Sequence, residues 1–472
     1  ESGIFVLNNE KYSKLFKLSD INFAGVTDLE QKTIIINFSK VLNSINCRFS
    51  YTVADEYVDE SAFSKRILYK KRGDDMDMLC DAFNEVINEK VTDAKQGLYQ
   101  TIYLTLTVEA KNIREAKNAL ASVEATLSST LIQIGINGMA GSSLEPVSLN
   151  ERMQIWYNFT HTGLHTNYKF DWQSCMKQNK DWIDIVSPES LVFYNDYFIL
   201  NGNRYGRVMY ISRHAQSLES DTLSELAKIN STNYVTVNSE LLDLSGYKQE
   251  IIRKHSSVGF QIEKEKKRNR DNNDFLADAS DKLLTEKDSL IKLSRQVETG
   301  DDHFFNTTVL IAFLAKSYEE MVDITDQIEA IGGVKSFDVK KCFDKQREGL
   351  NSTFMFGVQE FKRMTNFSAP CQAMYMPFKT QELNDPDGTF YGINKLSQNP
   401  IIANRKLLDS FHGMILGKTR YGKSLFAKCE IISNRCLHPE DQTLIIDPQN
   451  EYKGIAHAPG VNGTVVSFDT QF

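Results

Sequence analysis

One stretch decides the fold predicted for the last part of the chain: Gly413-Met414-Ile415-Leu416-Gly417-Lys418-Thr419-Arg420-Tyr421-Gly422-Lys423-Ser424. Residues 413–416 are compact and apolar, as in a buried β-strand. Residues 417–424 match the pattern GxxxxGK[ST], and residues 424–437 place apolar side chains at helical spacing. A strand, a glycine-rich loop and a helix in this order predict a phosphate-binding loop.

The residue types of this loop suit phosphate chemistry. Its terminal glycines let the backbone N–H groups curl around an anion, and the helix N-terminus adds a favourable dipole. Lys423 is predicted to reach the β- and γ-phosphates as a catalytic residue, and the Ser424 hydroxyl to bind Mg²⁺. ATP and Mg²⁺ are the expected cofactors, and the expected nucleotide contacts are Gly417, Lys418, Thr419, Arg420, Tyr421, Gly422, Lys423, Ser424 and Leu425.

Two loop residues are larger than usual. Arg420 and Tyr421 occupy positions that small residues often fill. They are predicted to contact the nucleotide, to contact a neighbouring subunit, or to be exposed to solvent.

A second apolar segment, Thr443–Ile446, is predicted to be a buried parallel strand that ends in Asp447. Carboxylates at the carboxyl end of such a strand face the nucleotide crevice, so Asp447 is a candidate nucleotide contact. Asp447 is not taken as the Walker B aspartate, because its strand follows the loop helix directly. Glu451 is a candidate catalytic residue that orients water or Mg²⁺, and the alternative is that it caps the next turn.

The first 340 residues contain two similar stretches. Phe5–Asn8 and Phe198–Asn201 each precede a basic residue, a tyrosine and an apolar segment. Further along, the predicted strands Tyr103–Val108 and Val309–Leu314 are each followed by an amphipathic helix. The shared order predicts a duplicated α+β unit, with an insertion near Glu263–Asp274 in the second copy. The alternative is that strand–helix junctions look alike by chance.

These patterns predict an α+β N-terminal region followed by the start of an α/β P-loop domain. The predicted parts are a first α+β unit at 1–149, a helical connector at 150–190, a second α+β unit at 191–380 and an incomplete P-loop ATPase domain at 381–472. No later strand with paired acidic residues, arginine finger or sensor segment follows the loop. We expect such a portion to bind ATP weakly and to hydrolyse it poorly or not at all.

Composition narrows the class of partner. The 472 residues carry a net charge of −8, so no long-range field favours DNA or anionic lipid. Lys264–Arg270 is the one dense basic run, suited to phosphate or membrane contact or to the solvated tip of a long helix. No apolar stretch approaches the roughly 18 residues of a membrane span. Seven scattered cysteines without a CxxC pair suggest reduced thiols in a cytoplasmic protein.

The last hundred residues resemble a family. The residues that carry the resemblance are Pro377-Phe378, Gln381-Glu382-Leu383, Asp385-Pro386, Phe390-Tyr391-Gly392-Ile393-Asn394, the stretch 413–424, Ile446-Asp447-Pro448 and Glu451-Tyr452. Together they resemble the large VirB-type ATPases of type IV secretion and conjugation systems, most closely the forms of Gram-positive conjugative elements. Residues 201–211 and 301–315 are consistent with the long N-terminal region of that family.

The resemblance implies a RecA-like core and an ATP-hydrolysing motor, usually hexameric or assembled with the secretion channel. It implies a place on the cytoplasmic side of the membrane, other subunits of the apparatus as partners, and a homo-oligomer when full length. Phosphate and Mg²⁺ roles transfer to Gly417, Gly422, Lys423 and Ser424. The sequence also leaves open a P-loop DNA translocase, although its charge does not indicate DNA contact, and a non-enzymatic assembly scaffold with a regulatory nucleotide site.

Overall fold

The apolar run Val309–Ala315 lies in strand β10 (Phe304–Ala315), which pairs antiparallel with a strand on each side. Successive side chains of a strand point to opposite faces of the sheet. Val309 and Ile311 belong to one buried apolar cluster, whereas Leu310 and Ala312 belong to another. Because both faces are covered, the run 309–315 is apolar at every position instead of alternating with polar residues.

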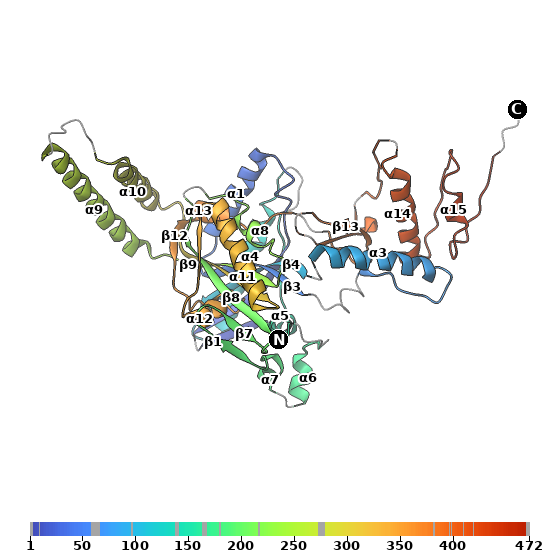
Figure 1. Cartoon of the computed structure of the whole chain (residues 1–472), viewed down its shortest axis with the longest axis horizontal. Coiled ribbons are helices and arrows are strands. Elements are labelled where there is room, and N and C mark those ends of the chain that lie inside the picture. Colours follow the sequence, from blue (N-terminus) through green and yellow to red (C-terminus); the bar gives the residue numbers. More distant parts are fainter. Residues whose placement is uncertain are drawn as a thin grey trace. The chain divides into compact units, whose positions relative to one another are not determined.

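The structure, a computed structural model, separates into two units (Figure 1). Unit 1 comprises Glu1–Ala54, Thr101–Gly163 and Phe170–Lys379, and unit 2 comprises Asp55–Gln100, Leu164–Lys169 and Thr380–Phe472. The structure describes residues 3–8, 10–57, 67–95, 98–136, 141–162, 168–178, 181–215, 218–271, 279–380, 383–395, 397, 399–408, 410–418 and 420–468.

Within the described residues the large sheet contains twelve strands. Nine of them follow the path β1-β2-β4-β3-β9-β10-β8-β7-β6, while β5 pairs with β2, β11 with β8 and β12 with β10. The strands other than β10 are β1 (Ile4–Asn8), β2 (Lys11–Leu18), β3 (Arg48–Tyr57), β4 (Leu98–Glu109), β5 (Leu144–Pro146), β6 (Leu191–Phe193), β7 (Phe198–Leu200), β8 (Arg204–Arg213), β9 (Asn233–Leu241), β11 (Asp338–Lys341) and β12 (Thr365–Ser368). The pairings β1–β2, β2–β4, β2–β5, β6–β7, β7–β8, β8–β10, β8–β11, β9–β10 and β10–β12 are antiparallel. The prediction of a mixed α+β architecture is therefore confirmed for this part of the chain.

The two halves of the sheet have the same order of strands. Going inward from one end, the order is β1-β2-β4-β3, and from the other end, after β6, it is β7-β8-β10-β9. In each half, a helix follows the corresponding strand. Helix α4 (Ile113–Ile132) follows β4, and helix α11 (Tyr318–Val334) follows β10. Each helix is capped by the side chain of the residue before it, since Asn112 accepts from the Glu115 amide and Ser317 from the Glu320 amide.

The likeness of the halves extends to a pair of polar contacts. Ser13 in β2 lies opposite Thr107, and Val208 in β8 lies opposite Ala312. A guanidinium nitrogen of the buried Arg152 donates to the carbonyl oxygen of Ser13 at 3.1 Å. The side-chain amide of the first residue of α12 donates to the carbonyl oxygen of Val208 at 3.1 Å. In each half, a long polar side chain thus fastens a helix to the same place on its strand.

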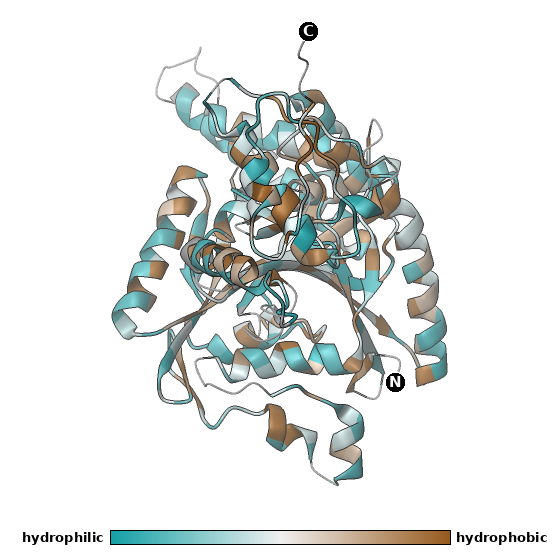
Figure 2. Ribbon diagram, turned by 90° about the vertical axis from the view of Figure 1, so that its right-hand side faces the viewer, coloured by the Kyte–Doolittle hydropathy of each residue, from teal (hydrophilic) through white to brown (hydrophobic). Residues whose placement is uncertain are grey.

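Helices cover both faces of the sheet. Apolar side chains of α1 (Asp28–Asn43), α4, α8 (Thr222–Leu226), α11, α13 (Ala369–Gln372) and η1 (Ala373–Tyr375) share one buried cluster with the strands. Those of α5 (Leu149–Thr160) and α12 (Gln346–Thr353) share the cluster on the other face. The helices carry both hydrophobic and hydrophilic residues (Figure 2), as expected where only one side of a helix is buried. Along the sequence, the short helices α6 (Trp172–Lys177) and α7 (Trp182–Val186) come after the first half and before β6 of the second.

A long helical hairpin distinguishes the second half. Helix α9 (Leu244–Asp271) packs along α10 (Asp281–Thr299), and both precede β10. Buried side chains join them in two clusters, including Ile251 with Val297 and Val258 with Leu290. The basic run 264–270 lies near the end of α9, and part of the predicted insertion, residues 272–274, lies outside the described residues.

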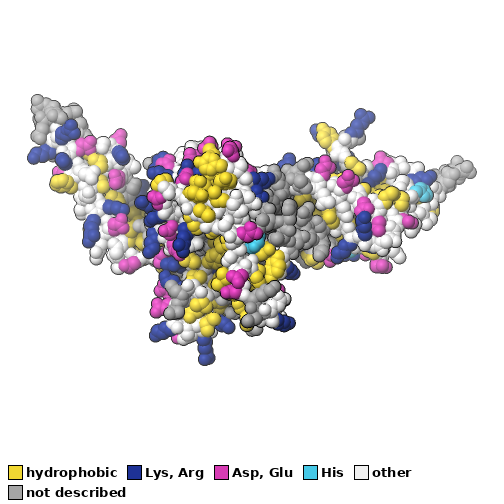
Figure 3. Space-filling model, turned by 60° about the horizontal axis from the view of Figure 1, so that its bottom comes forward, with side chains coloured by type: hydrophobic (Ala, Val, Ile, Leu, Met, Phe, Trp, Pro, Cys, Tyr) yellow, Lys and Arg dark blue, Asp and Glu magenta, His cyan; other side chains and the backbone are white. Residues whose placement is uncertain are grey.

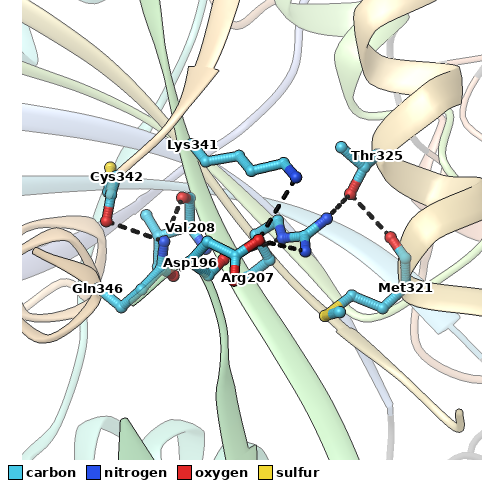
Figure 4. A network of polar contacts seen from close by, with 8 residues as sticks. All are labelled: Asp196, Arg207, Val208, Met321, Thr325, Lys341, Cys342 and Gln346. Atoms are coloured by element: carbon cyan, nitrogen blue, oxygen red, sulfur yellow. Dashed lines mark hydrogen bonds and ion pairs between the residues drawn. The ribbon is translucent and has the colours of Figure 1, made fainter. Parts of the chain in front are cut away.

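A buried arginine ties β8 to its neighbours (Figure 4). The side chain of Arg207 is 1% exposed and lies 2.9 Å from a carboxylate oxygen of Asp196. It also donates to the hydroxyl of Thr325 in α11 at 2.6 Å, and Lys341 reaches the same carboxylate oxygen of Asp196 at 3.4 Å. A buried charge is tolerated where it is paired and hydrogen-bonded, so this network holds the loop before β7 against the sheet and α11.

Unit 2 contains α3 (Asp77–Lys95), a hairpin of β13 (Thr389–Ile393) and β14 (Pro400–Ala403), the single turn η2 (Arg405–Leu407), α14 (Lys423–Leu437) and α15 (Lys453–Ala456). Side chains of α3, the hairpin and α14 form one apolar cluster. None of the helices in the described part of the chain is both long and apolar enough to cross a membrane.

Two predicted strands of unit 2 are wrong. Residues 413–416 and 443–446 are not assigned as strands, and Leu416 and Ile446 are 82% and 88% exposed. A strand needs a neighbour for its backbone hydrogen bonds. Within the described residues of 380–468, the pairing is that of β13 with β14 and an isolated bridge between Asn384 and Ile402, and neither involves residues 413–416 or 443–446. The predicted α/β sheet beside the loop is therefore absent from the described part of unit 2.

Candidate functional site

The glycine-rich loop leads directly into α14. The helix begins at Lys423, and Gly422 precedes it with a left-handed backbone, φ 83°. A Cβ atom at Gly422 would have no other atom within 4 Å, so this glycine is required for its backbone angle and not for space. The side chain of Lys423 folds back over the loop, where its ammonium donates to the carbonyl oxygens of Gly417 at 2.8 Å and Lys418 at 3.1 Å.

Gly417 lies under that lysine. A Cβ atom built at Gly417 would stand 3.2 Å from Cγ of Lys423, which is a tight contact. The two glycines that frame the loop therefore serve different needs, one a backbone angle and the other a close approach.

The middle of the loop projects into solvent. Arg420 has a φ of 71°, a left-handed value that residues other than glycine adopt at a cost of about 1–2 kcal/mol. Tyr421 is 78% exposed, and its amide donates to the carbonyl oxygen of Lys418 at 3.3 Å. Exposure of both side chains fits one of the three roles considered for them. Thr419, a predicted nucleotide contact, lies outside the described residues.

The first turn of α14 offers N–H groups to an anion. The first amides of a helix have no carbonyl partner within the helix, and no described side chain caps those of α14. The Phe426 amide donates to the carbonyl oxygen of Gly422 at 2.9 Å and so begins the helical ladder. Ser424 is half-buried in this first turn, whereas Leu425 is 66% exposed. The loop thus combines free amides, a helix dipole and an ammonium group, which is what a phosphate chain requires.

No known protein-family profile and no curated protein matches this chain. The interpretation of the loop accordingly rests on its residues and on the geometry described above.

Asp447 and Glu451 lie in a turn before α15. The backbone amide of Tyr452 donates to a carboxylate oxygen of Asp447 at 2.8 Å. This and further backbone hydrogen bonds, from residues 449–451, hold the pKa of Asp447 below its usual value. The Lys428 ammonium of α14 lies 5.4 Å from the centre of the Tyr452 ring, so the turn stands beside the helix. Glu451 is exposed. In this structure the Asp447 carboxylate caps the turn, which is the alternative role predicted for Glu451.

A pocket of about 550 Å³ opens along the flank of α14, against the β13–β14 hairpin. Helix residues Ala427, Glu430, Ile431 and Asn434 line one wall, and Tyr391 of β13 lines the other. These helix positions recur at the three- and four-residue spacing of one helical face. The sequence pattern does not indicate this pocket, although the polar residues Glu430 and Asn434 share a helical face with the apolar residues Ala427 and Ile431.

Two contacts fix the walls of the pocket. Glu430, whose side chain is only 14% exposed, accepts from the Tyr391 hydroxyl at 2.9 Å and lies 2.8 Å from Nε of Arg405. The Tyr391 ring lies 6.1 Å from the ring of Phe426, centre to centre. Burial raises the pKa of the Tyr391 hydroxyl above its usual value, which keeps that hydroxyl a donor to Glu430. The pocket thus begins one helical turn from the phosphate loop.

Proposed function

We propose that this protein binds ATP with Mg²⁺ through residues 417–424. The observation that supports this most directly is the path of Lys423, whose ammonium is held over the loop by the carbonyl oxygens of Gly417 and Lys418. That path places a positive charge beside the unpaired amides at the start of α14. A triphosphate is the ligand that best matches a cation, several N–H donors and a helix dipole in one place.

Each loop residue has a task in this proposal. The backbone amides around Gly422 would hold the phosphates, Lys423 would neutralise the β- and γ-phosphate charge, and the Ser424 hydroxyl would hold Mg²⁺. The metal would neutralise charge that develops on the phosphates during transfer. Asp447 is occupied by the backbone of its own turn, and we assign it no step.

We further propose that ATP hydrolysis makes the protein a motor that energises assembly of, or transfer through, a conjugative secretion apparatus. This part rests on the resemblance carried by residues 377–452. It implies a RecA-like core, other subunits of the apparatus and further copies of this chain as partners, and work at the cytoplasmic face of the membrane.

A second candidate is an assembly scaffold in which the nucleotide site is a regulatory switch. The observation that favours it is the large sheet of unit 1, whose two halves repeat the same order of strands and polar anchors. We infer that the halves derive from one duplicated α+β unit. Such a doubled surface suits the binding of other proteins.

A DNA translocase receives less support from the surface. Among the described side chains on the face shown in Figure 3, basic and acidic ones are interspersed and form no continuous basic stripe. Proteins that contact several phosphates lose DNA affinity steeply as salt rises. DNA binding with such a slope would favour the translocase over the other two functions.

The decisive experiment compares the wild type with Lys423→Ala. Titration calorimetry should detect MgATP binding by the wild type and a strong loss in the variant, because the variant lacks the charge at the loop. Lys453→Ala, which removes an exposed lysine from α15 of the same unit, is the matched control and should bind as the wild type does. Equal affinity of all three proteins would refute the proposed site.

Turnover of the full-length protein separates the motor from the scaffold, because residues 381–472 alone are expected to hydrolyse ATP poorly or not at all. If the wild type hydrolyses ATP and Lys423→Ala does not, the motor is supported. If ATP binds with no turnover that depends on Lys423, the scaffold is the better description.

A further inference from the structure

We propose that the pocket along the flank of α14 receives the base and ribose of the nucleotide whose phosphates bind at residues 417–424. This inference rests on the proposed nucleotide site and adds a second part to it, which no residue of the glycine-rich loop supplies. It assigns a role to Tyr391, Ala427 and Glu430.

Position is the first argument. Ala427, which lines the pocket, comes one helical turn after Lys423, and one turn rises only about 5.4 Å. The ring of Tyr391 stands beside Phe426, the residue between Ala427 and the first turn. A ligand whose phosphates bind at the start of α14 therefore needs to extend by only about one helical turn to enter this end of the pocket.

Shape and lining are the second argument. A volume of about 550 Å³ falls in the range of roughly 300–1,000 Å³ that small-molecule sites occupy. The lining alternates flat or apolar side chains, such as Tyr391, Ala427 and Ile431, with polar ones, such as Asn434 and Thr389. A nucleoside has the same mixture, since its base is flat with hydrogen-bonding edges and its ribose carries hydroxyl groups.

Rigidity is the third argument. Glu430 is held from two sides, by the Tyr391 hydroxyl and by Arg405, so the hairpin and the helix are fastened to each other across the pocket. A preformed pocket loses less freedom on binding than a mobile one. Because Arg405 neutralises Glu430, the wall does not repel a ligand that carries phosphates.

The test compares two ligands that share the phosphates but not the nucleoside, MgATP and magnesium tripolyphosphate. Ala427→Leu places a larger side chain in the pocket and should weaken ATP binding by about tenfold or more, in line with stacking contributions of about 1–3 kcal/mol per base. It should leave tripolyphosphate binding unchanged within about twofold. Ala121→Leu, at an exposed position of α4, is the matched control.

A second pair of variants guards against misfolding of the first. Tyr391→Leu removes the aromatic wall and should weaken ATP but not tripolyphosphate, whereas Tyr391→Phe keeps the ring and should restore most of the ATP affinity. Equal effects on both ligands, or no effect on ATP, would overturn the pocket assignment while leaving the phosphate loop intact. If the wild type bound neither ligand, the proposed function and the pocket would both fall.

Discussion

The ammonium of Lys423 donates to the carbonyl oxygen of Gly417 at 2.8 Å, across six positions of the chain. This bond closes the loop over its own first residue. The Lys423 ammonium is therefore held at the loop, and the position of this side chain depends on the space that Gly417 leaves for it.

Gly417→Ala should disturb this arrangement by crowding. The new Cβ would stand 3.2 Å from Cγ of Lys423, so the lysine must shift. An off-rotamer side chain costs about 0.5–1.5 kcal/mol, which predicts between roughly twofold and tenfold weaker ATP binding. Titration calorimetry measures the change. Gly454→Ala, at an open position of α15, is the control and should bind ATP normally.

Gly422→Ala should act through the backbone instead. A left-handed residue with a Cβ costs about 1–2 kcal/mol, and no neighbour within 4 Å adds to the cost. We expect lower thermal stability of unit 2 together with weaker ATP binding. Gly422→Asn should lose less, because asparagine tolerates the left-handed region better than alanine. Similar losses for both variants would contradict the assigned cause.

Arg207→Met should destabilise unit 1. Removing one member of a buried ion pair leaves its partner without a counter-charge and costs about 3–5 kcal/mol. Because Asp196 is 28% exposed and also meets Lys341, we expect the lower end of this range. Chemical denaturation measures the loss.

The matched control for Arg207 lies on the same strand. Arg213 forms an ion pair with Asp338, but both side chains are at least half exposed. Exposed pairs contribute about 0–1 kcal/mol, so Arg213→Met should change stability little. A loss as large as that of Arg207→Met would show that charge alone, and not burial, sets the effect.

His214 should make unit 1 sensitive to mild acid. Burial lowers the pKa of His214 to about 4, and its Nδ1 lies 2.6 Å from the Tyr375 hydroxyl. The unfolded chain, with an ordinary pKa near 6.5, binds the proton more readily than the folded chain between these values. Stability should therefore fall as pH decreases from about 6.5 to 4, by up to about 3 kcal/mol.

Denaturation curves recorded across that pH range test this prediction. His214→Gln should show a shallower loss of stability than the wild type, since it has no imidazole to protonate. His457→Gln, which removes an exposed histidine from unit 2, should follow the wild type. Parallel curves for all three proteins would exclude His214 as the source.

Local pattern was sufficient for much of the fold. The segment 309–314 predicted the strand β10, and the amphipathic segments after the strands 103–108 and 309–314 predicted the helices α4 and α11, because apolar residues are spaced differently in strands and helices. The junction of β3 with β9 was not predicted. Pairing between the edges of two similar units depends on long-range contacts that no local pattern encodes.

The site was predictable only in part. Spacing alone indicates residues 417–424 as a candidate phosphate loop, because the backbone angle of Gly422 and the reach of Lys423 are both set within eight residues. The predicted strands at 413–416 and 443–446 do not form. An apolar run favours a buried strand, but a strand also needs a neighbouring strand for its backbone hydrogen bonds. The pocket was missed because Tyr391 and Ala427, 36 positions apart, meet only after the hairpin packs against α14.

The place of β10 has a consequence for how unit 1 opens. It is hydrogen-bonded along both edges and covered on both faces, so no fluctuation of a single neighbour exposes its backbone. Amide protons of β10 should therefore be among the last to exchange with deuterium, at rates set by global unfolding. The end strands β1 and β6, each with one neighbour on the sheet path, should exchange long before it.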